Sequence, residues 1–316
     1  MGAAGLRFAI ADRDSTMRHP ISRRTFLRRA ALIAAAVPPA HLHALSGHAA
    51  AELRIGVLSP SGASDTGTLG TLDARLGVRL GVDEATHAAA LFGGSIEVVP
   101  VTLTSLRASR LSALLGAGDR DGCRSLSDAA AAAGIAFLNV RCADDGLRGS
   151  ECRATTFHVA PSDAMYRDAL AQAGAQAGAR ATAWDASLTR FGADTLNARF
   201  RARFNRAMTA DAWLGWVAVK ILWESSLRAK STDSRMLMQY MTRPGTQFDG
   251  HKGRALSFRP WDQQLRQPVY VVSAAGSAPP RVIAEAPVPA SAGETTSESL
   301  DRLGTPAARS ACRMSP

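Results

Sequence analysis

The sequence predicts an α/β fold built on an open, doubly wound parallel sheet. The main observation is the stretch 112–140, which reads SALLGAGDRDGCRSLSDAAAAAGIAFLNV and contains strand, turn, helix and strand signals in that order. A short apolar run ends at Gly116, and Asp119 and Asp121 stand where the capping residues of a helix belong. The Ala-rich helix ends at Gly134, and the apolar run that follows is typical of a strand covered on both faces. Two parallel strands joined by a crossover helix indicate an open α/β sheet.

The residues before this unit extend the predicted sheet. Hydrophobic periodicity predicts a strand that begins at Leu53 (LRIGVLS), a helix over Leu72–Leu91 and a strand over Ile96–Leu103. In sheets of this kind the ligand crevice lies at the carboxyl ends of the strands. The turn after Gly116 and the residues just past Leu138 are therefore expected at the crevice.

Helices dominate the sequence after residue 160. Apolar spacing predicts helices Met165–Ala173, Thr195–Met208, Ala212–Ala229 and Ser234–Tyr240, and strands Ala255–Phe258 and Val269–Val272. We expect Asp163 and Asp233 to cap two of these helices. The small-residue stretch 171–183 has no apolar run long enough for a buried strand. Residues 278–316 are rich in Pro, Ser, Ala and Thr without periodicity, which predicts a mostly disordered tail.

The first 51 residues have the features of a twin-arginine export signal. Residues Ser22–Leu27 read SRRTFL, a weakly apolar Ala30–Val37 follows, and small residues near Gly47 offer a cleavage site. The apolar segment is too short to span a bilayer, so we expect removal after export and a periplasmic protein without stable membrane insertion. The alternative is an Arg-rich disordered leader.

Charge and motifs exclude several classes of protein. The net charge is +10 over 316 residues, but positions 1–51 hold seven Arg and two Asp, which is half of the excess. No basic run is interleaved with stacking aromatics, so we expect no nucleic-acid partner. The sequence lacks the GxSxG, HExxH, Walker and EF-hand motifs, and His87, His158 and His251 lie far apart. We therefore expect no enzyme activity, no cofactor and no metal site.

The four cysteines, Cys123, Cys142, Cys152 and Cys312, are too scattered for a zinc or iron–sulfur site. Cys142 and Cys152 bracket the polar loop ADDGLRGSE and are candidates for a disulfide that closes it in an oxidising compartment. The alternative for this pair is two unpaired thiols.

Three segments resemble the type I periplasmic solute-binding proteins of ABC transporters, of the branched-chain amino acid and amide type. They are the strand, Gly turn, Ala-rich helix and strand of 112–140, the stretch Thr156–Asp163, and the turn FDGHKG at Phe248–Gly253. The resemblance implies two lobes that close around a solute. Because His158 lies where the chain would leave the first lobe, we expect it to be a hinge or packing residue.

The resemblance also implies a domain organisation. The expected parts are a signal region at 1–51, lobe 1 at 52–163, a junction and remnant of lobe 2 at 164–194, C-terminal helices and a hairpin packed on the lobes at 195–277, and the tail at 278–316. Lobe 2 is expected to be truncated, because the stretch 171–183 stands where the family has the strands of that lobe. Half a cleft predicts weak solute binding or none.

Two further segments resemble a subgroup of these proteins associated with alcohol catabolism that depends on pyrroloquinoline quinone (PQQ). They read RPWDQQLRQPVYVV at 259–272 and SLDRLGTPAARSACR at 299–313. The subgroup implies an accessory transport component, and nothing in the spacing of these residues indicates that the chain binds the quinone.

The implied function is the substrate-binding component of an ABC-type importer, with permease subunits as partners. The candidate ligand contacts are Ser59, Ser61, Asp119, Asn139 and Arg141. Because Asp119 and Asp121 would repel a carboxylate or cap the helix themselves, a small polar solute that is neutral or cationic fits better. The alternative is a periplasmic interaction or sensor protein that keeps lobe 1 as a docking surface and binds no solute.

Overall fold

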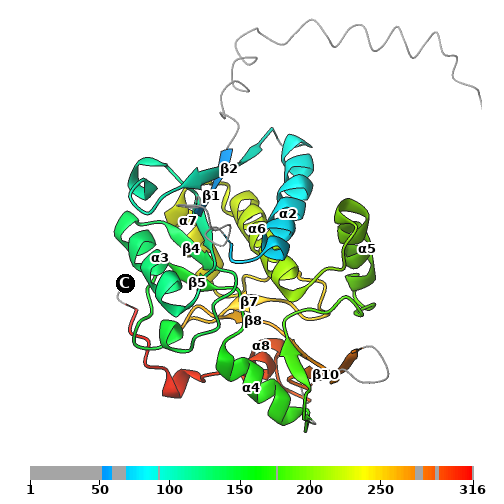
Figure 1. The fold of residues 1–316 in the computed structure, drawn as a ribbon. Coiled ribbons are helices and arrows are strands. Elements are labelled where there is room, and N and C mark those ends of the chain that lie inside the picture. The colour runs from blue at the N-terminus through cyan, green and yellow to red at the C-terminus, as the bar shows by residue number, and fades with distance from the viewer. Residues whose placement is uncertain are drawn as a thin grey trace, which may run out of the picture. The chain divides into compact units, whose positions relative to one another are not determined.

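A five-stranded parallel sheet forms the main layer of the protein (Figure 1). Its strands are β1 (Glu52–Leu58), β2 (Ser95–Val101), β3 (Ala113–Gly116), β4 (Ala136–Asn139) and β5 (Thr156–His158), in the order β2-β1-β3-β4-β5. Every neighbouring pair is parallel, and within the predicted unit Leu114 of β3 lies opposite Phe137 of β4. The predicted α/β fold with a parallel sheet is therefore confirmed.

The computed structural model describes residues 52–58, 69–91, 93–175, 177–274, 280–288 and 292–314. The export signal expected at 1–51 lies outside these residues. All elements below belong to one unit, Ala50–Pro316. Among the described helices, none combines the length and the apolar character that crossing a bilayer requires.

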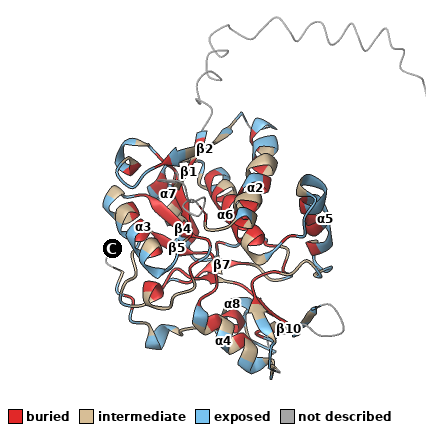
Figure 2. Cartoon of the chain, viewed as in Figure 1, coloured by how far each residue is buried: buried red, intermediate tan, exposed pale blue. Residues whose placement is uncertain are grey.

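Helices cover both faces of the parallel sheet. Helices α2 (Leu72–Leu91), α6 (Ala210–Ala229) and α7 (Ser234–Thr242) share one apolar cluster with the sheet, and α3 (Arg120–Ala133) shares another. Leu115 and Leu138 belong to the first cluster, whereas Leu114 and Phe137 pack with Leu126 of α3 in the second. Side chains alternate between the two faces of a strand, so helices on both faces require the continuous apolar runs of β3 and β4. Figure 2 shows these strands as buried.

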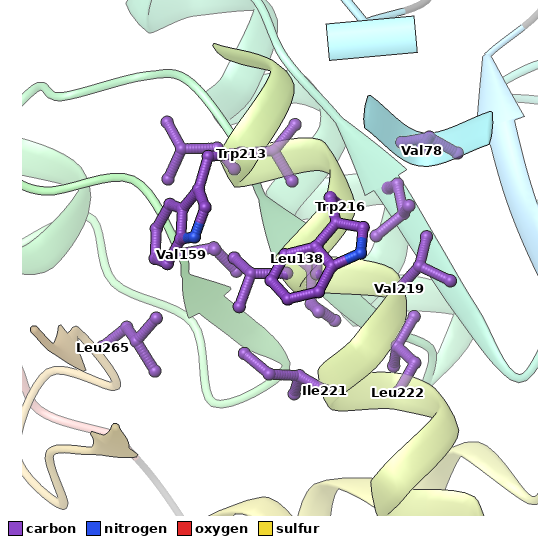
Figure 3. Packing of buried hydrophobic residues seen from close by; sticks show 14 of the residues in the cluster. Val78, Leu138, Val159, Trp213, Trp216, Val219, Ile221, Leu222 and Leu265 are labelled. Carbon is purple, nitrogen blue, oxygen red and sulfur yellow. The ribbon is translucent and has the colours of Figure 1, made fainter. Parts of the chain in front are cut away.

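Helices α2 and α6 approach each other closely because glycines lie at their contact. A Cβ on Gly77 would lie 1.9 Å from the carbonyl oxygen of Ala212, and a Cβ on Gly215 would lie 2.5 Å from that of Ala74. The core between α6 and the sheet contains two tryptophans (Figure 3). Its residues include Val78, Leu138, Val159, Trp213, Trp216, Val219, Ile221 and Leu222.

A second, antiparallel sheet has three strands in the order β10-β9-β6. They are β6 (Arg180–Thr182), β9 (Val269–Val272) and β10 (Val282–Ala286). Helix α4 (Asp163–Gln172) packs on this sheet through Met165 and Ala169, and Leu303 completes the small core. Helix α5 (Ala193–Phe204) lies against α2, where Arg199 forms an ion pair with Glu84.

A short hairpin connects the two sheets. It consists of β7 (Ser257–Phe258) and β8 (Leu265–Arg266). The backbone N–H of His158 donates to the carbonyl oxygen of Gln263 at 3.0 Å, and the Gln264 amide donates to that of His158 at 3.1 Å. The amide of Gln267, just before β9, donates to the carbonyl oxygen of Val159 at 2.6 Å. His158 is buried in this junction, which agrees with a packing residue.

Several predicted boundaries match the structure. The predicted ranges Leu72–Leu91 and Val269–Val272 coincide with α2 and β9, and Asp233 caps α7 through the N–H of Met236. The cap of α4 was assigned to the wrong residue, because the hydroxyl of Ser162 accepts from the N–H of Met165 at 3.1 Å and Asp163 is the first helical residue.

The second half of the chain has ordered segments that the sequence did not predict. Stretch 171–183 has no buried strand, as expected, but it contains the short edge strand β6, whose three residues are ordered by pairing with the distant β9. The predicted disordered tail contains β10 and α8 (Thr296–Leu300) among its described residues. Polar contacts order this segment, including the Asp301 cluster, in which Arg259 and Arg266 both bind the Asp301 carboxylate at 2.8–3.0 Å.

The predicted disulfide between Cys142 and Cys152 is also wrong. Cys152 is bonded to Cys312, and Cys142 is a buried free thiol. Cys142 follows β4 and turns inward toward Cys123 of α3, and Leu147 completes this small cluster. A hydrogen bond with Cys123 lowers the pKa of the Cys142 thiol to about 7, and the same hydrogen bond together with burial raises that of Cys123.

Candidate functional site

The carboxyl edge of the parallel sheet is where the sequence predicts the site. Two of the predicted contacts, Ser59 and Ser61, lie outside the described residues. Asp119 is exposed just past the tip of β3, and its Oδ1 accepts a hydrogen bond from the N–H of Gly122 at 2.9 Å. Asp119 therefore caps α3, the role that its position in the sequence indicated.

Asn139 is fully buried at the tip of β4 and organises the loop that follows. Its Oδ1 accepts from the backbone N–H groups of Arg141 at 3.1 Å and Cys142 at 2.9 Å, and its Nδ2 donates to the carbonyl oxygen of Cys142 at 2.8 Å. Nδ2 also lies 3.1 Å from Nδ1 of His158. Because Oδ1 accepts from two backbone N–H groups, Nδ2 is the donor to His158, and Nδ1 carries no proton. Both ends of the Asn139 amide are thus bonded within the protein.

His158 is held in its neutral form by this arrangement. Its Nε2 donates to the carbonyl oxygen of Leu147 at 3.1 Å. Burial, and to a smaller extent the nearby Arg148 cation, lowers the pKa of His158 well below its usual value. At neutral pH His158 is therefore an uncharged part of the framework that holds the strand tips.

Arg141 connects the tip of β4 to the first turns of two helices. Its Nε lies 3.6 Å from Oδ2 of Asp211 in α6. The same oxygen accepts a hydrogen bond from the hydroxyl of Thr71, just before α2, at 2.9 Å. The carboxyl edge of the sheet and the starts of α2 and α6 therefore meet at one carboxylate.

A cavity of about 480 Å³ lies beside this carboxylate. Its lining comes from β6 and the residues after it, from the loop that leads into α6 together with the first turn of that helix, and from the first turn of α2. The polar and aromatic residues of the lining are Asp73, Arg180, Thr182, Trp184, Asp185, Thr209 and Asp211. Residues of the second sheet thus face helices of the parallel-sheet layer across this cavity, which we call the interlayer cavity.

Each carboxylate of the interlayer cavity has a cationic partner. The N–O distances are 3.3 Å for Arg206 and Asp73, 3.4 Å for Arg180 and Asp185, and 3.6 Å for Arg141 and Asp211. These pairs reach solvent, so each contributes about 1 kcal/mol or less to stability, and their main effect is to neutralise the rim. Among the described residues of the lining itself, three carboxylates stand against one cation, Arg180.

Trp184 forms an apolar wall of the interlayer cavity. Its ring is almost fully buried, and its Nε1 donates to Oδ1 of Asn197 at 2.9 Å. It stacks on Trp213 of α6, with ring centroids 5.7 Å apart and planes 6° from parallel. Both contacts fix the indole in one orientation, so this wall is rigid.

Most of this lining could not be recognised from the sequence. Asp73 and Asp211 appear as ordinary acidic residues in the first turn of a helix, and Trp184 and Asp185 follow a strand that was not predicted. Of the predicted contacts, Arg141 alone lies within ion-pair distance of a residue that lines the cavity in the described structure. Among the described residues, no group of three or more His, Cys, Asp and Glu side chains is placed to hold a metal ion.

Comparisons with known proteins are informative at the level of structure. No protein-family model matches the sequence, and no curated protein matches it either. Solved structures do match. A leucine-, isoleucine-, valine-, threonine- and alanine-binding protein from Brucella ovis in a closed conformation has a TM-score of 0.67 at 10% identity, with 84% of this chain and 100% of that chain covered.

Two further solved structures resemble the chain to a similar degree. An ABC-type branched-chain amino acid transporter from Rhodopseudomonas palustris has a TM-score of 0.63 at 12% identity, covering 81% of this chain and 98% of that one. A periplasmic binding protein from Burkholderia mallei has a TM-score of 0.61 at 12% identity, covering 84% and 99%. At these identities the similarity concerns the fold. The chain has the α/β fold of the type I periplasmic binding proteins.

Proposed function

We propose that the protein is the periplasmic substrate-binding component of an ABC-type importer for a small polar solute. The observation that supports this proposal is the interlayer cavity, whose Asp211 lies 3.6 Å from Arg141 at the carboxyl edge of the parallel sheet. Open α/β sheets bind ligands at this edge. The disulfide between Cys152 and Cys312 fits an oxidising compartment outside the cytoplasm, and so does the export signal expected at 1–51.

The charges of the cavity favour a neutral or cationic solute. Asp73, Asp185 and Asp211 line it, and two of their arginine partners, Arg206 and Arg141, lie outside its described lining, so the surface that a ligand meets is more acidic than basic. Trp184 offers an apolar face for a hydrocarbon part of the solute. We therefore propose amino alcohols, amides or small amines as the first classes to test, with Asp211 and Arg141 as contacts.

The proposal includes a reduced second lobe. The second sheet has three short strands, and one helix, α4, supplies most of its apolar cover. A small lobe closes over less of a solute and buries less of its surface, so weak affinity is expected.

The proposed link to PQQ-dependent alcohol catabolism rests on the segments 259–272 and 299–313. In the structure these two segments contact each other, because the Asp301 cluster joins them and Nε1 of Trp261 donates to the carbonyl oxygen of Thr305 at 3.2 Å. The contact gives both segments a structural role. Genes for a quinoprotein dehydrogenase, a permease and an ATPase beside this gene would support the link, and their absence would count against it.

The solute-binding proposal is tested by calorimetric titration and thermal shift of the purified protein with alcohols, amino acids, amides and polyamines. We expect one class to raise the melting temperature in a dose-dependent way. Asp211→Asn should weaken that binding about tenfold, because it removes a charged contact. Asp128→Asn is the matched control, since it removes an exposed pair with Arg153 (2.7 Å) that lies outside the cavity.

A response to none of these solutes would favour the second candidate, an interaction or sensor protein that binds no solute. The observation in its favour is that every carboxylate at the rim of the interlayer cavity already has a cationic partner.

A further inference from the structure

A second cavity, of about 330 Å³, lies apart from the interlayer cavity and has the opposite charge. The loop before α5, the turn that follows Gly250, strand β10 and helix α8 line it. Its charged and hydroxyl side chains are Arg190, Lys252, Arg254, Glu285, Thr296 and Ser299. Among the described residues of the lining, three basic side chains stand against one carboxylate, and we call this the basic cavity.

Lys252 is the most deeply buried of these basic residues, with 1% of its surface exposed. Its ammonium group donates to Oε1 of Gln267 and to the carbonyl oxygen of Pro268, both at 2.9 Å, and lies 3.9 Å from the centre of the Trp213 ring. These partners are all neutral. Burial lowers the pKa of Lys252 well below its usual value. The positive charge of the basic cavity is therefore carried by Arg190 and Arg254.

Arg254 presents an unused donor in the same cavity. Its Nη2 lies 3.2 Å from Oε1 of Glu285 and donates to the carbonyl oxygen of Pro287 at 2.7 Å. Its Nη1 is buried and has no hydrogen-bond partner among the described residues. A buried donor without an acceptor costs free energy, and an anion seated against the guanidinium would remove that cost.

We propose that the basic cavity binds a small oxyanion, of the carboxylate or phosphate class. Arg254 and Arg190 are the groups that contact the oxyanion, and Thr296 supplies a hydroxyl donor. Arginine suits this role because its planar fork of N–H groups matches two oxygens of a carboxylate or phosphate. The pair of Glu285 with Arg254 leaves the Arg190 cation and the unused Nη1 of Arg254 for the ligand.

The two cavities are connected by a buried stack of side chains. Lys252 lines the basic cavity and lies over Trp213, and Trp213 stacks on Trp184, which lines the interlayer cavity. The oxyanion site uses a different set of residues from the solute site and does not depend on it.

Calorimetric titration with inorganic phosphate and, in a separate arm, acetate tests the proposal, with ionic strength held constant by chloride. We expect saturable binding of at least one of the two anions. The anion that binds more tightly shows whether the site prefers a phosphate or a carboxylate. Arg190→Gln should weaken that binding about tenfold, and Arg254→Gln about ten- to a hundredfold, because each removes a charge-assisted donor. Arg235→Gln on α7, which is exposed and outside the cavity, is the control with the same change of charge.

Several results would overturn the oxyanion site. The first is that the wild-type protein binds neither anion. The second is that Arg235→Gln weakens binding as much as Arg190→Gln does, which would indicate general attraction of anions to a basic protein. The Arg190 side chain is exposed, so its variant keeps the test valid if Arg254→Gln fails to fold. Asp211→Asn should leave oxyanion binding unchanged, which separates this result from the test of the solute site.

Discussion

The parallel sheet and the second sheet are stabilised in different ways. Strands β3 and β4 are buried on both faces and are covered by α2, α6 and α3, so hydrophobic burial dominates there. The second sheet has short strands and a small apolar core, and the C-terminal residues beside it are held to the rest of the chain by a few specific links. Arg259, 1% exposed, reaches Asp301, and Cys152 is bonded to Cys312.

This difference predicts different responses to single changes. A broad apolar core distributes its free energy over many contacts, whereas a region held by a few links loses much of its stability when one link is removed. The following predictions test the comparison, beginning with the largest expected effect.

Removal of the disulfide should have the largest effect. Cys152→Ser combined with Cys312→Ser should lower the free energy of unfolding by about 4 kcal/mol, because this bond closes a long loop of 160 residues. Urea unfolding followed by circular dichroism measures the change, and dithiothreitol should have no further effect on the double variant. Peptide mapping without reduction should recover the Cys152–Cys312 pair; a Cys142–Cys152 peptide would contradict the structure.

Disruption of the Asp301 cluster should have the second largest effect on the free energy of unfolding. Asp301→Asn should cost about 3 kcal/mol, because it leaves the nearly buried guanidinium groups of Arg259 and Arg266 without their shared carboxylate. The control is Asp128→Asn, which removes an exposed ion pair and should cost less than about 1 kcal/mol. Equal unfolding free energies for the two variants would refute a special role for the cluster.

The helix contact in the parallel-sheet layer should be sensitive to added volume. Gly77→Ala should destabilise the protein by about 2 kcal/mol, because its Cβ would lie 1.9 Å from the Ala212 carbonyl oxygen and the helices would have to move apart. Gly118→Ala is the matched control, since its Cβ would meet no atom closer than 3.6 Å. Thermal unfolding of both variants checks the expectation, and a stable Gly77→Ala variant would mean that α2 and α6 are less close.

The pH dependence of stability should report on His158. Burial lowers its pKa in the native state below the value of about 6.5 expected in the unfolded state, so the unfolded state binds more protons in that interval. Stability is therefore fully present above pH 6.5 and falls below it, by up to about 1.4 kcal/mol per pH unit, until the native pKa is reached. His158→Gln should flatten this slope between pH 7 and pH 5, and an unchanged slope would assign it to other groups.

The success of the sequence-based predictions follows the same division between the two sheets. The 112–140 unit carries its own signals, because Asp119 caps α3, Gly134 ends it in the left-handed region and the apolar runs around it need cover on both faces. Strand β6 has three residues and no such signal, and it is ordered by β9 far along the chain. The disulfide was mispaired for the same reason, since the proximity of Cys312 to Cys152 is a property of the folded chain.

The candidate site shows most clearly which features cannot be predicted from the sequence. The sequence by itself determined the parallel sheet and the position of Arg141 just past the end of one of its strands, because periodicity, caps and glycines act over short distances along the chain. Tertiary structure alone decided three other features: the partner of Arg141 in α6, the Trp184 wall and the unused donor of Arg254. Each of these features arises from contacts between residues far apart in sequence. A local sequence pattern does not indicate which distant side chain will lie beside it in the folded protein.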